Sequence, residues 1–177
     1  ALQVARDSKD RKFELYSLKF ISTSRALNQQ YEESELYLDS AMKLAVEMNE
    51  LSSIADIQNK RGHNFQQTGH LEEATQAYLA SCKTSEELED WEGLSTAYHN
   101  LCSVFSILEQ PKELAFYVQK SLALLPKLED PLVKVSSIAY ATGYFAENAV
   151  THPTYVDSAI FYANMGLKIA EEFNFEN

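Results

Sequence analysis

Residues 58–65 read QNKRGHNF, and residues 98–105, forty positions later, read YHNLCSVF. In both stretches a small residue, Gly62 or Cys102, stands three positions before a phenylalanine. A second small residue, Ala74, follows Gly62 by twelve positions. Because a period of 20–50 residues is typical of proteins that stack one supersecondary unit, this recurrence predicts a repeat fold.

The same period extends along the whole chain. Glu50, Asp90 and Asp130 fall in register, and residues 1–10 match residues 41–50 in their pattern. We therefore expect one array, with the end of an upstream helix at 1–10 and repeats at 11–50, 51–90, 91–130 and 131–177. The last repeat should contain about five extra residues around Asn148–Tyr155, which predicts a lengthened loop between its helices.

The composition favours an all-α fold. The 177 residues are 45% hydrophobic but include only 5 Gly and 4 Pro, too few for the many turns of a β fold. Asp90 and Asp130 are suited to cap helices, and Pro111, Pro131 and Pro153 to first helical turns. The expected helices lie near 11–28, 31–48, 51–68, 71–88, 91–108, 111–127, 131–149 and 154–173.

These spacings resemble the tetratricopeptide repeat, whose signature is W-x₂-L-G-x₂-Y followed by A-x₃-F and P. The match at Tyr98, Leu101, Cys102 and Phe105 keeps the spacing but not every identity, and the pitch is forty rather than ~34 residues. The resemblance is therefore to the long-repeat type. It implies a right-handed α-solenoid of about four helical hairpins, or eight helices, that binds proteins or peptides and is not an enzyme.

In this family the first helix of each hairpin lines a concave groove, which implies a peptide-binding surface of aromatic and polar side chains. Their hydroxyl, amide and imidazole groups can bond the backbone of an extended segment. The candidate groove residues are Tyr16, Lys19, Phe20, Thr23, Asn59, Lys60, His63, Gln67, His99, Asn100, Ser103 and Tyr140. A merely solvated inner face, in an array that only spaces or oligomerises its parent protein, stays open as the alternative.

The resemblance also suggests two finer roles. Some family members are co-chaperones that clamp a carboxylate tail with Lys, Arg and Asn, but here Thr23 stands where Asn is needed. Asn100 instead resembles the backbone-binding Asn of the long-repeat branch. The long repeats, the short joints between them and the lack of catalytic residues resemble those of sensory arrays in bacterial histidine kinases and transcriptional regulators. That implies a regulatory part of a signalling protein. The sequence itself does not encode a compartment; the cytoplasm is slightly favoured over the periplasm, which would apply to a membrane-anchored sensor.

Charge and motif content exclude several other classes. The net charge of −11 opposes nucleic-acid binding and favours a neutral or basic partner segment. No apolar run reaches the length of a membrane span. No phosphate-binding loop, nucleophile elbow or zinc motif occurs, so we expect no cofactor, no metal and no catalytic residue, with His63 and His99 as solvated groove residues.

The cysteines and the chain ends give two further expectations. Cys82 and Cys102 are expected to be small packing residues, with a disulfide in an oxidising compartment as the alternative. Both ends of the sequence cut through the repeat, which suggests an interior segment of a longer protein. Its ends would then expose apolar surface and favour end-to-end self-association.

Overall fold

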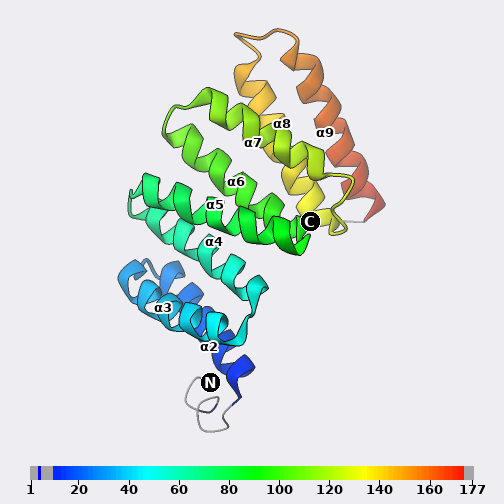
Figure 1. The fold of residues 1–177 in the computed structure, drawn as a ribbon. Helices are drawn as coiled ribbons and strands as arrows, with labels where there is room; N and C mark the ends of the chain where they lie inside the picture. The colour runs from blue at the N-terminus through cyan, green and yellow to red at the C-terminus, as the bar shows by residue number, and fades with distance from the viewer. Residues whose placement is uncertain (1–3, 5–9, 174–177) are drawn as a thin grey trace. The chain divides into compact units, whose positions relative to one another are not determined.

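The structure, a computed structural model, describes Val4 and residues 10–173. Within those residues all regular structure is α-helical, as predicted (Figure 1). The eight helices are α2 (Arg11–Leu27), α3 (Tyr31–Met48), α4 (Leu51–Gln67), α5 (Leu71–Leu88), α6 (Trp91–Ile107), α7 (Pro111–Leu124), α8 (Pro131–Asn148) and α9 (Tyr155–Glu172). The expectations for residues 1–10 and for the last four residues lie almost wholly outside the described residues.

The chain divides into two compact units, with the boundary between Glu89 and Asp90. The first unit contains the hairpins α2/α3 and α4/α5, and α4 packs on both helices of the hairpin before it. The second contains α6/α7 and α8/α9, and α8 likewise packs on both α6 and α7. Each unit therefore consists of two helical hairpins stacked in the same order.

Helix ends recur at the forty-residue period. The backbone is left-handed at Gln29, Gly69 and Glu109, the second residue of each three-residue hairpin loop. The next residue in each loop donates its N–H to a carbonyl five positions back, for example His70 to Phe65 at 2.8 Å. Such a bond satisfies a carbonyl that a helix end leaves unpaired. The loops are thus one structure built three times, although only one of them has glycine at the left-handed position.

Helix starts follow the predicted caps. The carboxylate of Asp90 accepts from the N–H of Gly93 at 3.0 Å, and that of Asp130 accepts from Leu132 at 2.8 Å. Pro111 and Pro131 open α7 and α8. Pro153 does not lie in a first turn, because α9 begins only at Tyr155.

Small residues lie where the helices of a hairpin cross. In the first unit Gly62 of α4 is buried beneath the ring of Tyr78 of α5. In the second unit Cys102 of α6, Val118 of α7 and Ala141 of α8 form a buried core cluster. Both cysteines are buried and neither forms a disulfide, so the packing prediction is confirmed.

Two details differ from the sequence-based expectation. Helix α7 ends at Leu124 instead of 127, because the proline at 126 lacks an N–H and disfavours a helical residue before it. In the first three hairpins the second helix begins twenty residues after the first, whereas α9 begins 24 residues after α8. The last hairpin therefore contains four extra residues rather than five.

Candidate peptide-binding surfaces

The predicted groove residues belong to two surfaces, which we describe one for each unit. Tyr16, Lys19, Phe20 and Thr23 lie on α2, and Asn59, Lys60, His63 and Gln67 lie on α4; together they form what we call the α2–α4 surface. His99, Asn100 and Ser103 lie on α6, and Tyr140 lies on α8; these belong to the α6–α8 surface.

An ion triad occupies the centre of the α2–α4 surface. The ammonium groups of Lys19 and Lys60 lie 2.9 and 3.3 Å from the two carboxylate oxygens of Asp56. Lys19 also donates to the hydroxyl of Ser53 at 3.4 Å. Because one carboxylate is shared by both lysines, the cations that a carboxylate clamp would need are already paired within the chain. This geometry argues further against an acidic-tail clamp.

Two exposed aromatic rings lie on α2, which also carries Lys19 of the triad. Tyr16 and Phe20, one turn apart on α2, are stacked with ring centroids 6.4 Å apart and an interplanar angle of 18°. Their exposed fractions are 62% and 64%, high for large rings. Exposed stacked aromatics provide apolar contact area at a low cost in side-chain entropy. They are the most accessible apolar feature of this surface.

The other predicted residues of the α2–α4 surface differ in what they can offer. The hydroxyl of Thr23 donates to the carbonyl of Lys19 at 3.0 Å, so its proton is already used. His63 is exposed, and desolvation together with the neighbouring Lys60 lowers its pKa, so its imidazole is neutral at pH 7. Asn59 is partly buried and Gln67 is exposed at the end of α4.

The α6–α8 surface contains a cavity of about 510 Å³. Of the predicted residues, Ser103 and Tyr140 line it, and their side chains are hydrogen-bonded to each other. That bond lowers the pKa of Tyr140 less than burial raises it, so the phenol stays protonated. The other lining residues are Cys102, Ser106, Ile107, Leu114, Ala139, Gly143, Tyr144 and Glu147. The cavity therefore combines an apolar wall with hydroxyl groups and one carboxylate.

The prediction that His99 is a solvated groove residue is wrong. Its Nε2 lies 2.9 Å from the hydroxyl of Ser121 on α7, and its ring stacks on Tyr140 with centroids 5.1 Å apart and planes within 3°. Burial lowers the pKa of His99 to about 4, so it is neutral near pH 7. The ring thus packs on Tyr140, and His99 does not line the cavity. Asn100, next to it, is partly buried and also lies outside the lining.

Gly143 and Tyr144 are functional candidates that the sequence analysis missed. They lie on the helical face that already includes Tyr140 and Glu147, three or four positions from each. A Cβ built on Gly143 would have no atom within 4 Å, so the missing side chain leaves open space at the cavity wall. Stepping along α8 by three and four would have found both, but a glycine offers no side chain to evaluate.

Other kinds of site are not apparent in the described residues. Between residues 10 and 173, no group of three or more His, Cys, Asp or Glu side chains is placed to hold a metal ion. No helix there has both the length and the apolarity needed to cross a membrane.

Comparisons with known proteins bear on the fold. No protein-family model matches the chain, and no curated protein matches its sequence. Among solved structures, BtubC (BKLC) from P. vanneervenii is similar over 95% of this chain and 67% of its own, with a TM-score of 0.73 and 14% identity. The TPR-like repeats of a putative kinesin light chain from Podosopora anserina match over 92% of this chain and 78% of that one, with a TM-score of 0.65 and 14% identity. A structure of a substituted form of those repeats gives a TM-score of 0.67 at 13% identity, over 92% of this chain and 77% of that one.

The chain has a TPR-like repeat fold. The expected fold class, an all-α repeat solenoid, is confirmed. At identities near 14% the likeness concerns the fold alone, and the function of the TPR-like chain must be argued from its surfaces.

Proposed function

We propose that the chain is a non-catalytic interaction module that binds a peptide or protein segment along its first helices. The observation that carries the proposal is the α6–α8 cavity. Its volume of about 510 Å³ falls within the range of ~300–1,000 Å³ that is usual for ligand pockets. Its lining mixes apolar groups with a few hydrogen-bonding groups, as ligand sites generally do.

The lining favours one apolar side chain of an extended segment as the anchor. Ile107, Leu114 and the ring of Tyr144 supply the apolar wall. The hydroxyls of Ser103 and Ser106 can donate to or accept from the segment's backbone, which in an extended peptide has no internal partners. Glu147 at the same cavity favours a basic residue beside the anchor.

Charge supports a neutral or basic partner. The chain has 26 acidic against 15 basic residues, so its field attracts cations and repels anions. On the α2–α4 surface, Lys19 and Lys60 share Asp56, which leaves little free positive charge to attract an acidic segment. Association should therefore slow as salt rises, because the screening length falls to ~8 Å at physiological ionic strength.

We place the module in the regulatory part of a larger signalling protein. Support for this finer role comes only from the resemblance of its long repeats to sensory arrays. The test is whether the partner found below changes the output of the full-length protein.

A peptide selection with a filled-cavity variant tests the binding proposal. Random extended peptides displayed on phage would be selected on the wild-type chain and on Gly143→Met. The methionine side chain should fill the cavity, while the loss of a helical glycine should stabilise α8 by ~1 kcal/mol. We expect wild-type peptides to share an apolar residue next to a basic one, and to bind Gly143→Met at least tenfold more weakly.

Gly143→Ala is the matched control, because it gives the same helix-propensity gain with only one added carbon. It should bind the selected peptides within threefold of wild type. If Gly143→Met binds as tightly as wild type while remaining folded, the segment does not use this cavity.

Self-association is a second candidate role, and α9 favours it. No residue of α9 is buried, and three of its large apolar side chains are mostly exposed: Ile160 at 55%, Phe161 at 57% and Leu167 at 62%. An exposed apolar face of this kind is typical of an interface. Sedimentation of wild type and of Phe161→Glu at micromolar concentration tests this role. If the wild type is monomeric under these conditions, the self-association role is excluded.

A further inference from the structure

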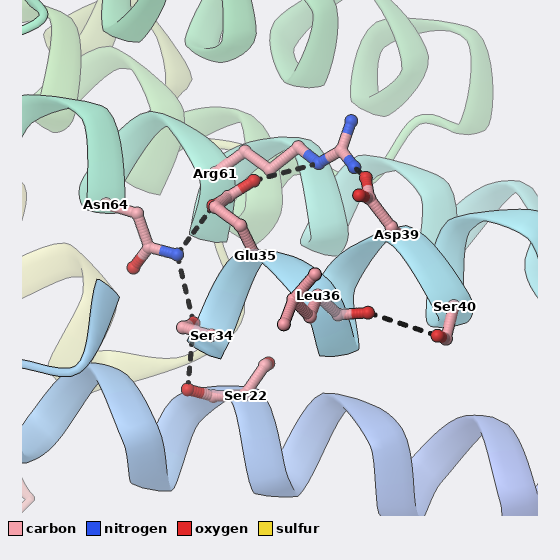
Figure 2. Close-up of polar contacts among 8 residues, drawn as sticks. All are labelled: Ser22, Ser34, Glu35, Leu36, Asp39, Ser40, Arg61 and Asn64. Carbon is pink, nitrogen blue, oxygen red and sulfur yellow. Dashed lines mark hydrogen bonds and ion pairs between the residues drawn. The ribbon is translucent and has the colours of Figure 1, made fainter. Parts of the chain in front are cut away.

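A chain of hydrogen bonds links three helices of the first unit and fixes the orientation of Asn64 (Figure 2). The hydroxyl of Ser34 on α3 donates to the carbonyl oxygen of Ser22 on α2 at 2.9 Å. Its single proton is then used, so toward α4 the Ser34 oxygen can only accept. Nδ2 of Asn64 supplies that donor at 2.9 Å, and also donates to the carboxylate of Glu35 at 2.6 Å.

Because both neighbours require a donor, the amide of Asn64 cannot be turned around. Both of its N–H groups are used, and its oxygen accepts no hydrogen bond from any described residue. Asn64 is only 2% exposed, and buried amide oxygens almost always have a partner. Asn64 is thus a largely buried side chain whose oxygen receives no donor from the described residues and stays accessible to a ligand or to solvent.

Asn64 lines a cavity of about 170 Å³ that opens between the start of α3 and the end of α4. The cavity belongs to the first unit, and none of its lining residues is among those of the α2–α4 surface. Its walls are mainly apolar, and the residues that line it include the aromatic Tyr31, Phe65 and His70 and the acidic Glu32 and Glu35. Thr68, which also lines it, holds the ring of His70 through a 3.0 Å contact to Nδ1.

The polar groups of this cavity are mainly acceptors. Glu35 is partly buried, and its carboxylate faces Arg61 at 3.5 Å, but that arginine also pairs with Asp39 (Figure 2). Glu32 is exposed in the first turn of α3, and no ion pair forms to it among the described residues. The local charge is therefore negative, and burial raises the pKa of Glu35 more than the hydrogen bond from Asn64 and the charge of Arg61 lower it.

We propose that this cavity binds a guanidinium group, the side chain of an arginine in a partner protein. A guanidinium ion carries five N–H donors and no acceptor, which matches the amide oxygen of Asn64 and the two carboxylates. Its flat face stacks on aromatic rings, and Phe65 supplies one. An anion would be repelled by Glu32 and Glu35, and a purely apolar group would leave Asn64 unpaired. This proposal involves no residue of the α6–α8 cavity, so either proposal can fail alone.

Capped amino acids test the proposal directly on the whole chain. Nα-acetyl-arginine methylamide would be titrated into ¹⁵N-labelled protein, and the amide signals of Asn64 and Phe65 followed by NMR. The citrulline derivative is the matched control, because it has the same shape without the charge. We expect the arginine compound to shift these signals with at least tenfold higher affinity than citrulline.

A pair of variants distinguishes arginine binding by the cavity from a general attraction to the negative charge of the chain. Glu32→Gln removes one carboxylate of the cavity and should weaken arginine binding at least fivefold. Glu72→Gln makes the same change at the equivalent position of α5, forty residues later and outside the cavity. It should leave the affinity within twofold of wild type. If both variants weaken binding equally, or citrulline binds as well as arginine, the proposal is wrong.

A last comparison decides the source of the guanidinium. The peptide Gly-Gly-Arg-Gly-Gly, capped at both ends, should bind at least as tightly as free arginine, because a partner's arginine carries no free amine or carboxylate. If free arginine binds clearly better than the peptide, the site is for a free amino acid, and the assignment to a partner protein is overturned.

Discussion

The ring of Tyr78 lies so close to Gly62 that a Cβ on the glycine would come within 2.5 Å of ring atom Cε1 and 2.6 Å of Cδ1. Tyr78 is completely buried, and its hydroxyl donates to Oε1 of Gln66 at 3.0 Å. The ring therefore cannot retreat without breaking that hydrogen bond or disturbing its packing. This contact determines how closely α4 and α5 approach.

Gly62→Ala should consequently lower the free energy of unfolding. Overpacking a tight core costs ~1–3 kcal/mol, and replacing a helical glycine returns ~1 kcal/mol, so we expect a net loss of up to about 2 kcal/mol. Urea unfolding followed by circular dichroism measures it. Gly143→Ala is the control, since its Cβ meets open space and should raise stability by up to about 1 kcal/mol. Equal effects at the two sites would contradict this account of the contact.

At the left-handed loop positions, introducing glycine should raise the free energy of unfolding, whereas Gly62→Ala lowers it. Gln29 and Glu109 have φ values of 60° and 54°, whereas the equivalent residue of the middle loop is Gly69. A residue with a side chain pays a penalty of roughly 1 kcal/mol in this conformation. Gln29→Gly and Glu109→Gly should each raise the free energy of unfolding by ~0.5–1 kcal/mol, and Gly69→Ala should lower it by a similar amount. Thermal unfolding of the three variants measures these changes. A loss of stability in all three would contradict the equivalence of the loops.

The helices could be predicted from the sequence because their signals are local and repeated. The forty-residue period, the caps at Asp90 and Asp130 and the prolines of α7 and α8 each act within a few residues of the chain. Four units that agree in register reinforce one another. The period alone predicts an end of α7 at 127, three residues too late, because it does not include the helix break before Pro126.

Much of the surface could not be predicted, because it depends on side chains from other helices. The direction of His99 is decided by Ser121 and Tyr140, which lie 22 and 41 residues further along the chain. Lys19 and Lys60 are candidate groove residues from the sequence, but the sequence does not show that Asp56 pairs with both. Spacing along a helix predicts which face of that helix a residue occupies. It does not predict which side chains of other helices that residue contacts.

Arg61 should be the most important ionic side chain of the first unit. It pairs with Glu35 and Asp39 of α3, and its side chain is only 23% exposed. Arg61→Gln would leave partly buried Glu35 without its nearest cation and raise its pKa further. We expect a loss of ~1–3 kcal/mol at pH 7.5, smaller at pH 5, where the raised pKa lets Glu35 take up a proton in the folded state.

Arg25→Gln is the control for that measurement. Arg25 pairs with Glu33 at 3.4 Å, and the two side chains are 39% and 50% exposed. Exposed pairs contribute ~0–1 kcal/mol, so this variant should lose less than about 0.5 kcal/mol at either pH. A loss as large as that of Arg61→Gln would show that the pairs are energetically alike.

His99 should make the second unit sensitive to mild acid. Burial lowers its pKa to about 4 in the folded state, whereas an unfolded histidine titrates near ~6.5. The unfolded chain therefore binds a proton more readily, and the contribution of neutral His99 is complete above pH ~6.5. It is lost progressively as the pH falls toward 4, by an amount on the order of 3 kcal/mol at ~1.36 kcal/mol per pKa unit.

The measurement is the free energy of unfolding from pH 4.5 to 8, for the wild type and for His99→Gln. Carboxylates contribute to the acid dependence of both proteins, so the difference between their slopes isolates the histidine. We expect the wild type to lose stability more steeply than the variant between pH 6.5 and 4.5, whatever the variant's stability at pH 8. Parallel slopes would mean that His99 is solvated in the folded chain, and the stacked contact with Tyr140 would have to be abandoned.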